Sequence, residues 1–224
     1  AALQTADPIL AKRGQMSEDD PLFADRDTKI WTMNNRAVAL RRLGRHEEAI
    51  QQLEGASQFQ EGGNAHVSQI LNLAQSYCSM GRPQQARVTL DRLGKYLSPY
   101  GEMVKASTEH RIAVQTGDTA AAKKAMDYLR KHRSDSYSLY LWALLETQQL
   151  DHAAELIKGL LASPKDRTEA LGWAQHSIEL PPQTADVVSE ANFKAVLARA
   201  DVASAIAKVG YVEQYPIFIG YMNN

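Results

Sequence analysis

Small and apolar residues recur at helical spacing on both sides of a break at Gly44. Before the break, Met33, Ala37 and Leu40 fall at positions i, i+4 and i+7, which lie on one face of a helix. After the break, the same spacing is kept by Ala49, Leu53 and Ala56. Gly44 can adopt the left-handed conformation that commonly ends a helix. The pattern therefore predicts two antiparallel helices that share one apolar seam.

The same break returns three times along the chain. Gly81 and Gly117 are each flanked by apolar residues at helical spacing, and Gln148 stands at a fourth break that lacks glycine. Positions 44, 81, 117 and 148 are separated by 37, 36 and 31 residues, close to the roughly 34-residue period of helix–turn–helix arrays. One hairpin cannot bury its seam alone, so we expect about four hairpins to stack on one another.

These residues resemble the tetratricopeptide repeat family. The resemblance rests on a small residue, an aromatic or leucine three positions later, glycine four after that, and alanine five after the glycine. The first two repeats carry this motif as Ala37, Leu40, Gly44, Ala49 and as Ala74, Tyr77, Gly81, Ala86. The third departs from it at His110, which is either a packed core histidine or a local opening. The resemblance covers about residues 30–165 and implies a right-handed helical solenoid that binds proteins.

We accordingly expect an all-α fold. Its expected parts are a leader over residues 1–28, about four hairpins over 29–165, capping helices over 166–210 and an apolar tail over 211–224. Within the cap, one helix should run from Ser163 to about Leu180, and Asp201 should be the N-cap of the last helix. The leader is interpreted as a connector or as a segment folding into the groove. The tail either packs on the last helices or mediates self-association, so a homo-oligomer through it is one candidate partner arrangement.

The first helix of each hairpin should line a concave groove with the side opposite its seam. The residues counted onto that surface are Trp31, Asn34, Asn35, Val38, Arg41, Arg42, Asn72, Gln75, Arg111 and Trp142. Amides can hydrogen-bond an extended backbone, and arginine can bind a carboxylate with two parallel bonds. The groove is therefore predicted to bind an extended or helical peptide with some acidic character. The alternative is that most of these side chains are only solvated. Some tetratricopeptide repeat domains bind the acidic C-terminus of heat-shock chaperones with a clamp of basic and amide residues. At the positions of this sequence that match the clamp, only Asn72 is a fitting residue, so binding of heat-shock chaperones in this way is rejected.

Composition excludes several other classes of function. The formal net charge is −1 and the pI is about 6.7, which gives no basic field for nucleic acid. No apolar run approaches the ~18 residues of a membrane span, and the single cysteine, Cys78, excludes an internal disulfide. The six histidines form no cluster with metal-ligand spacing, and no glycine-rich phosphate loop follows a strand, so neither a metal nor a cofactor is expected.

The sequence thus favours a non-catalytic scaffold that binds a protein or peptide in a larger assembly. Two alternatives stay open: the repeat module of a larger multidomain regulator or secretion or envelope component, and the accessory part of an enzyme whose catalytic domain is absent. The chain begins at Ala1, which fits a processed or a trimmed form. Both a periplasmic or secreted location and a cytoplasmic one therefore remain candidates.

Overall fold

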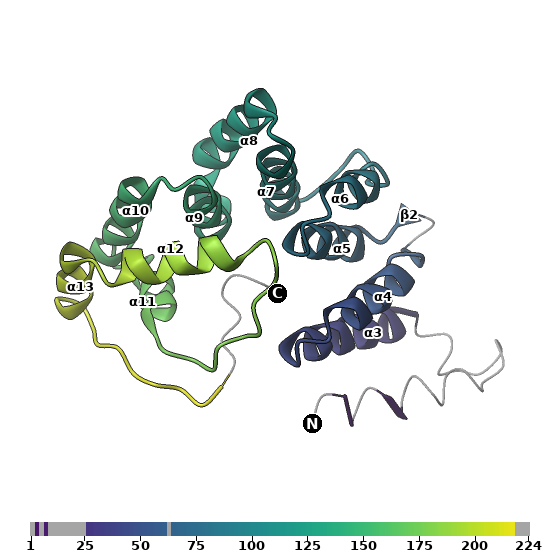
Figure 1. The fold of residues 1–224 in the computed structure, drawn as a ribbon, viewed down its shortest axis with the longest axis horizontal. Helices are drawn as coiled ribbons and strands as arrows, with labels where there is room; N and C mark the ends of the chain where they lie inside the picture. The colour runs from purple at the N-terminus through teal and green to yellow at the C-terminus, as the bar shows by residue number, and fades with distance from the viewer. Residues whose placement is uncertain (1–2, 5–6, 9–25, 62–63, 218–224) are drawn as a thin grey trace. The chain divides into compact units, whose positions relative to one another are not determined.

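The computed structural model describes residues 3–4, 7–8, 26–61 and 64–217 (Figure 1). The leader expected over residues 1–28 lies almost wholly outside this part, as do the last residues of the tail. The chain divides into two compact units. Unit 1 comprises residues 1–101 with 180–183, and unit 2 comprises residues 102–179 with 184–224.

Unit 1 is built from two helical hairpins. The first hairpin contains α3 (Arg26–Arg42) and α4 (His46–Ala56), and the second contains α5 (Val67–Ser79) and α6 (Pro83–Leu90). The helices pack within each hairpin, and α4 packs against α5 (Figure 1). Between the hairpins, two short antiparallel strands pair, β1 (Gln60–Glu61) and β2 (Asn64–Ala65).

The predicted seams form the core of unit 1. Ala37 and Leu40 of α3 are almost fully buried, as are their predicted counterparts Ala49, Leu53 and Ala56 of α4. In the second hairpin the seam again lies inside, with Ile70, Leu73, Ala74, Tyr77, Ala86 and Leu90 buried. Met33 packs so closely on α4 that a Cβ built on Gly55 would lie 2.6 Å from its Cε. A small residue at position 55 therefore lets α3 and α4 approach each other.

Unit 2 contains the helices that follow α6, apart from the first three residues of α7, which belong to unit 1. They are α7 (Pro99–Thr116), α8 (Thr119–Lys131), the 3₁₀ turn η1 (Arg133–Asp135), α9 (Tyr137–Glu146), α10 (Leu150–Ala162), α11 (Arg167–Ala174), α12 (Val187–Leu197) and α13 (Ala200–Ala207). Helix α9 packs on α8, α10 and α12, and α10 also packs on α11, α12 and α13. The described part of the chain is thus all-α apart from the short β1–β2 pair (Figure 1).

Two details of the predicted cap were wrong. The helix expected to reach Leu180 ends at Ala174, because residues 175–178 pair with the tail instead. The N-cap of α13 is Arg199 rather than Asp201, which lies in the first turn and accepts a hydrogen bond from the N–H of Val202. A carboxylate there still suits the positive end of the helix dipole.

All four predicted turn positions share one backbone geometry. Gly44, Gly81 and Gly117 have φ of 74°, 69° and 73°, and Gln148 has φ of 54°. In each turn the next N–H bonds back across the turn to a carbonyl five residues earlier, from Arg45 to Leu40 at 2.9 Å in the first and from Gln149 to Leu144 at 2.8 Å in the fourth. This is the Schellman motif that ends many helices. The fourth turn therefore forms without glycine.

Candidate functional site

In unit 1, an amide pair joins the first helices of the two hairpins at positions predicted to face the groove. The Nδ2 of Asn72 on α5 donates a 2.9 Å hydrogen bond to the Oδ1 of Asn34 on α3. Trp31, one turn before Asn34, is 44% exposed, and its ring meets that of His66 edge-on at 6.1 Å between centroids. A polar pair and an exposed aromatic ring therefore lie next to each other along α3.

The other predicted residues of unit 1 are reachable by solvent. Asn35 is exposed, while Val38, Arg41, Arg42 and Gln75 are half-buried. We call the set Trp31, Asn34, Asn35, Val38, Arg41, Arg42, Asn72 and Gln75 the α3–α5 face. It combines amides, two arginines and an aromatic side chain on adjacent helices, which can hydrogen-bond an extended chain and attract a carboxylate.

The two predicted residues of unit 2 are buried instead. Arg111 on α7 is 4% exposed, and its Nε lies 2.6 Å from Oε1 of Glu146 on α9. A second nitrogen of Arg111 donates to Oδ1 of Asp186, whose side chain is fully buried. His110, which is 1% exposed, completes this cluster with Nδ1 3.2 Å from the other oxygen of Glu146. Of the two interpretations of His110, the packed core histidine is confirmed.

Helix α12 accounts for this burial. Asp186 immediately precedes α12, and within the helix the Nδ2 of Asn192 donates a 2.9 Å hydrogen bond to the carbonyl oxygen of Leu145 on α9. Trp142, which is also on α9, is only 6% exposed. The chain around α12 thus contacts Arg111 through Asp186 and packs on α9. Because Arg111 and Trp142 are both buried, we leave them out of the proposed binding surface.

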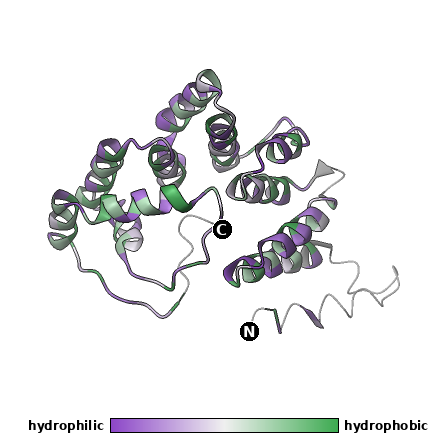
Figure 2. Ribbon diagram, in the orientation of Figure 1, coloured by the Kyte–Doolittle hydropathy of each residue, from purple (hydrophilic) through white to green (hydrophobic). Residues whose placement is uncertain are grey.

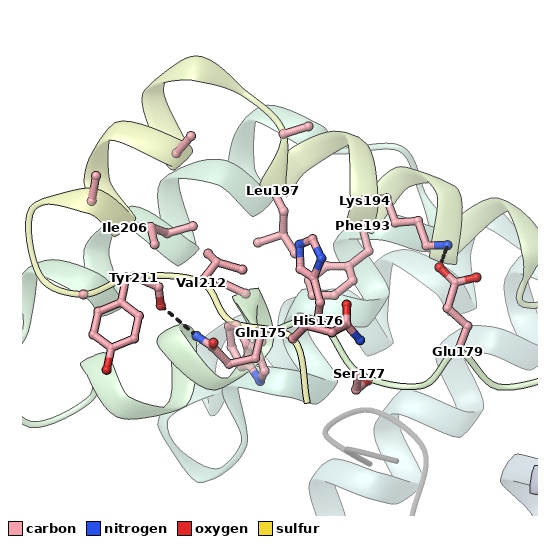
Figure 3. A pocket seen from close by; sticks show the side chains of 17 residues that line it. Gln175, His176, Ser177, Glu179, Phe193, Lys194, Leu197, Ile206, Tyr211 and Val212 are labelled. Atoms are coloured by element: carbon pink, nitrogen blue, oxygen red, sulfur yellow. Dashed lines mark hydrogen bonds and ion pairs between the residues drawn. The ribbon is translucent and has the colours of Figure 1, made fainter. Parts of the chain in front are cut away.

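A cavity of about 810 Å³ lies among the last helices of unit 2 (Figure 3). Its apolar walls include Trp173 of α11, Phe193 and Leu197 of α12, Ala203 and Ile206 of α13, and Val212 of the tail. The imidazole of His176 projects toward Phe193 and Leu197, while Glu179 and Lys194 form an ion pair of 2.6 Å at one side (Figure 3). The hydrogen bond from Lys194 lowers the pKa of Glu179 below its usual range.

The tail closes one side of this cavity by pairing with the segment after α11. His176 donates its N–H to the carbonyl oxygen of Glu213 at 2.9 Å and accepts from the N–H of Tyr215 at 2.8 Å. The side chain of Gln175 also holds the tail, because its Nε2 donates to the carbonyl of Tyr211 at 3.1 Å and its Oε1 accepts from the N–H of Glu213 at 2.9 Å (Figure 3). This finding agrees with the expectation that the tail packs in the cap, at least as far as residue 217.

Sequence reasoning missed the cavity. Its walls come from segments 173–179, 193–198 and 203–214, and no periodic pattern joins them. The only signal was the apolar character of the tail, which was interpreted as a packing segment. Hydropathy alone does not mark the site either, since hydrophobic and hydrophilic residues are mixed on α11 and α13 (Figure 2).

Among the described residues, no group of three or more His, Cys, Asp or Glu side chains could hold a metal ion. None of the helices described there is long and apolar enough to cross a membrane.

The packed hairpins, their repeated left-handed turns and their shared seams define a helical-repeat protein. Residues 30–61, which span α3 and α4, match the family model described as tetratricopeptide repeat. Residues 30–61 thus form a tetratricopeptide repeat, in agreement with the resemblance found in the sequence. Comparison with curated proteins and with solved structures gave no match.

Proposed function

We propose that the chain is a non-catalytic scaffold that binds a protein partner through the α3–α5 face. Repeats of this family generally mediate protein–protein interactions, and the matching repeat is the one that carries α3. The observation that carries the proposal is the hydrogen bond between Asn34 and Asn72. It fixes the two first helices against each other and so holds the neighbouring exposed groups in a set arrangement.

The chemistry of this face favours an extended peptide with acidic character. The amides of Asn35 and Gln75 offer both donors and acceptors to a peptide backbone. Arg41 and Arg42 supply positive charge in the last turn of α3. Trp31 is the exposed aromatic group on which an apolar side chain of the partner would rest, and tryptophan is enriched among residues that dominate binding energy. We place the partner within a larger assembly.

The test is capture of partners from lysate of the source cells with the full chain as bait. The variant Trp31→Ala/Asn35→Ala/Gln75→Ala removes three exposed or half-exposed groups of the face and spares the Asn34–Asn72 bond. The matched control, Gln51→Ala/Gln84→Ala/Tyr96→Ala, changes an equal number of similar residues on the other helices of unit 1 and the loop after α6, all exposed. We expect a partner that is retained by the control and lost by the face variant. A partner retained equally by both would contradict the proposed surface.

The tail supports a second proposal, self-association. Tyr211 is 73% exposed and Ile217 is 54% exposed, although both are large apolar side chains. Clustered exposed apolar residues mark interaction surfaces more often than isolated ones do. Light scattering over a range of concentrations should give a mass above that of one chain for the wild type. Tyr211→Ser/Ile217→Ser should restore the mass of one chain, and a monomeric wild type at all concentrations would end the proposal.

A further inference from the structure

The cavity is lined by residues of unit 2 and uses none of the residues of the α3–α5 face. Trp173 is 4% exposed and Ile206 is 6% exposed, so these two apolar side chains of the wall are almost fully buried. A volume of about 810 Å³ lies within the range of roughly 300–1,000 Å³ that is typical of small-molecule sites, which are mostly apolar with a few placed polar groups. The lining of this cavity has that composition.

The walls suit an aliphatic chain better than a peptide. A peptide would bring backbone N–H and C=O groups into the cavity, and each needs a hydrogen-bond partner when it is buried. The wall contains two amides, Gln175 and Gln214. Gln175 already makes hydrogen bonds to the carbonyls of Leu171 and Tyr211 and to the N–H of Glu213. The remaining deep surface, from Trp173, Leu197 and Ile206, offers carbon atoms for an apolar chain.

The edge of the cavity offers positive charge. Lys194 faces the cavity edge and is held by Glu179, but both side chains are largely exposed, at 64% and 77% (Figure 3). Exposed ion pairs are weak, so an incoming carboxylate can replace Glu179, which then remains solvated. His176 adds an imidazole that points between Phe193 and Leu197 (Figure 3).

We propose that this cavity binds a small amphipathic carboxylate of the medium-chain fatty acid class. The aliphatic chain lies against Trp173, Leu197 and Ile206, and the carboxylate bonds to Lys194 beside His176. The site lies outside the repeat hairpins that the family model matches, so its success or failure is independent of the α3–α5 face.

The first test is isothermal titration calorimetry of the full chain with hexanoate, octanoate and decanoate, each below its micelle concentration. Burying a methylene group is worth about 0.8 kcal/mol, so each pair of added methylenes should tighten binding by about tenfold. Absence of binding by all three acids, or equal affinity for all three, would overturn the proposal.

Substitutions then locate the ligand. Ala203→Trp places a large side chain into the cavity from α13 and should abolish decanoate binding, whereas Ser204→Trp, next to it on the same helix but outside the lining, should leave binding unchanged. Ala207→Phe is a second filling variant, and circular dichroism shows which of them keep the helical content of the wild type. A folded filling variant that binds decanoate as the wild type does would place the ligand elsewhere and overturn the assignment.

The head group is tested separately. Lys194→Met should weaken octanoate binding by about tenfold, the usual scale for a hydrogen bond between charged groups, but should not weaken binding of the uncharged octan-1-ol. Lys208→Met is the control, because Lys208 is exposed and does not line the cavity. Equal losses for Lys194→Met and Lys208→Met, or equal losses for the acid and the alcohol, would contradict the carboxylate contact.

Discussion

The N–H of Gln149 donates a 2.8 Å hydrogen bond to the carbonyl oxygen of Leu144, and the residue between them in the turn, Gln148, has φ of 54°. The left-handed region costs a residue with a side chain roughly 1–2 kcal/mol, and glycine escapes most of that cost. The fourth hairpin therefore has the same turn geometry as the others, although Gln148 must adopt an unfavourable backbone conformation to form it.

Gln148→Gly should consequently stabilise the protein. We expect the free energy of unfolding to rise by about 1 kcal/mol, since the backbone penalty at this position is removed. Urea denaturation followed by circular dichroism measures the change. Gln148→Ala keeps the Cβ atom and serves as the control. A glycine variant no more stable than the alanine variant would show that the turn is not strained.

The buried cluster around Arg111 should be far more sensitive to substitution than surface ion pairs are. Arg111→Ala leaves Glu146 and Asp186 buried without their cation, and breaking a buried pair in this way typically costs about 3–5 kcal/mol. Thermal unfolding should show a large fall in midpoint. Arg45→Ala, which breaks the exposed pair with Glu48, should leave the midpoint almost unchanged. Similar effects of the two substitutions would contradict this role of the cluster.

Tyr77 should make stability depend on pH in the alkaline range. Burial, together with the hydrogen bond to Glu54 and its charge, raises the pKa of Tyr77 from 10.0 to about 12. The unfolded chain releases this proton at lower pH than the folded one, so the contribution is complete below pH 10 and is lost as pH rises toward 12.

Tyr77→Phe cannot release that proton. Its free energy of unfolding should fall less between pH 10 and 12 than that of the wild type, as measured by urea denaturation at several pH values. Tyr96→Phe, at a residue that is 93% exposed, is the control and should follow the wild type. A Tyr77→Phe variant with the same alkaline slope as the wild type would rule out this residue as the cause.

Gln175 should control how firmly the tail is held. Gln175→Ala removes hydrogen bonds to Tyr211 and Glu213 but leaves the backbone pairing with His176 in place. Loss of about 1.4 kcal/mol of local stability would speed amide exchange about tenfold at Glu213 and Tyr215. Hydrogen exchange read by NMR tests this, with amides of α5 as the internal reference. Unchanged exchange in the tail would mean that the backbone pairing alone holds it.

The repeat hairpins could be predicted from sequence because their determinants are local. The seam of Ala37, Leu40, Ala49 and Leu53 and the turn at Gly44 are specified by residues within one hairpin, and each lies where the pattern placed it. The turn at Gln148 was also predicted, because the flanking apolar residues keep the helical spacing although glycine is absent.

The candidate site could be predicted only in part, for a reason of sequence distance. Asn34 and Asn72 lie 10 and 9 residues before the turns at Gly44 and Gly81, so helical counting brings them to one face. Arg111 was placed on that face by the same counting, but Asp186, which buries it, lies 75 residues away and belongs to no repeat. The cavity is formed by several segments that are distant in sequence but meet in the fold, and helical periodicity does not predict such contacts.

The bond between Arg111 and Asp186 also bears on how unit 2 comes apart. In a simple array each repeat touches only its neighbours, so the ends can melt while the middle stays folded. The buried ion pair between Arg111 and Asp186, which are 75 residues apart, prevents such independent melting. If α12 detached, the paired charges of α7 and α9 would be exposed. Unit 2 should therefore melt in one cooperative step, and its folding should wait for the chain beyond Asp186 to arrive, which makes this half of the protein the slower to form.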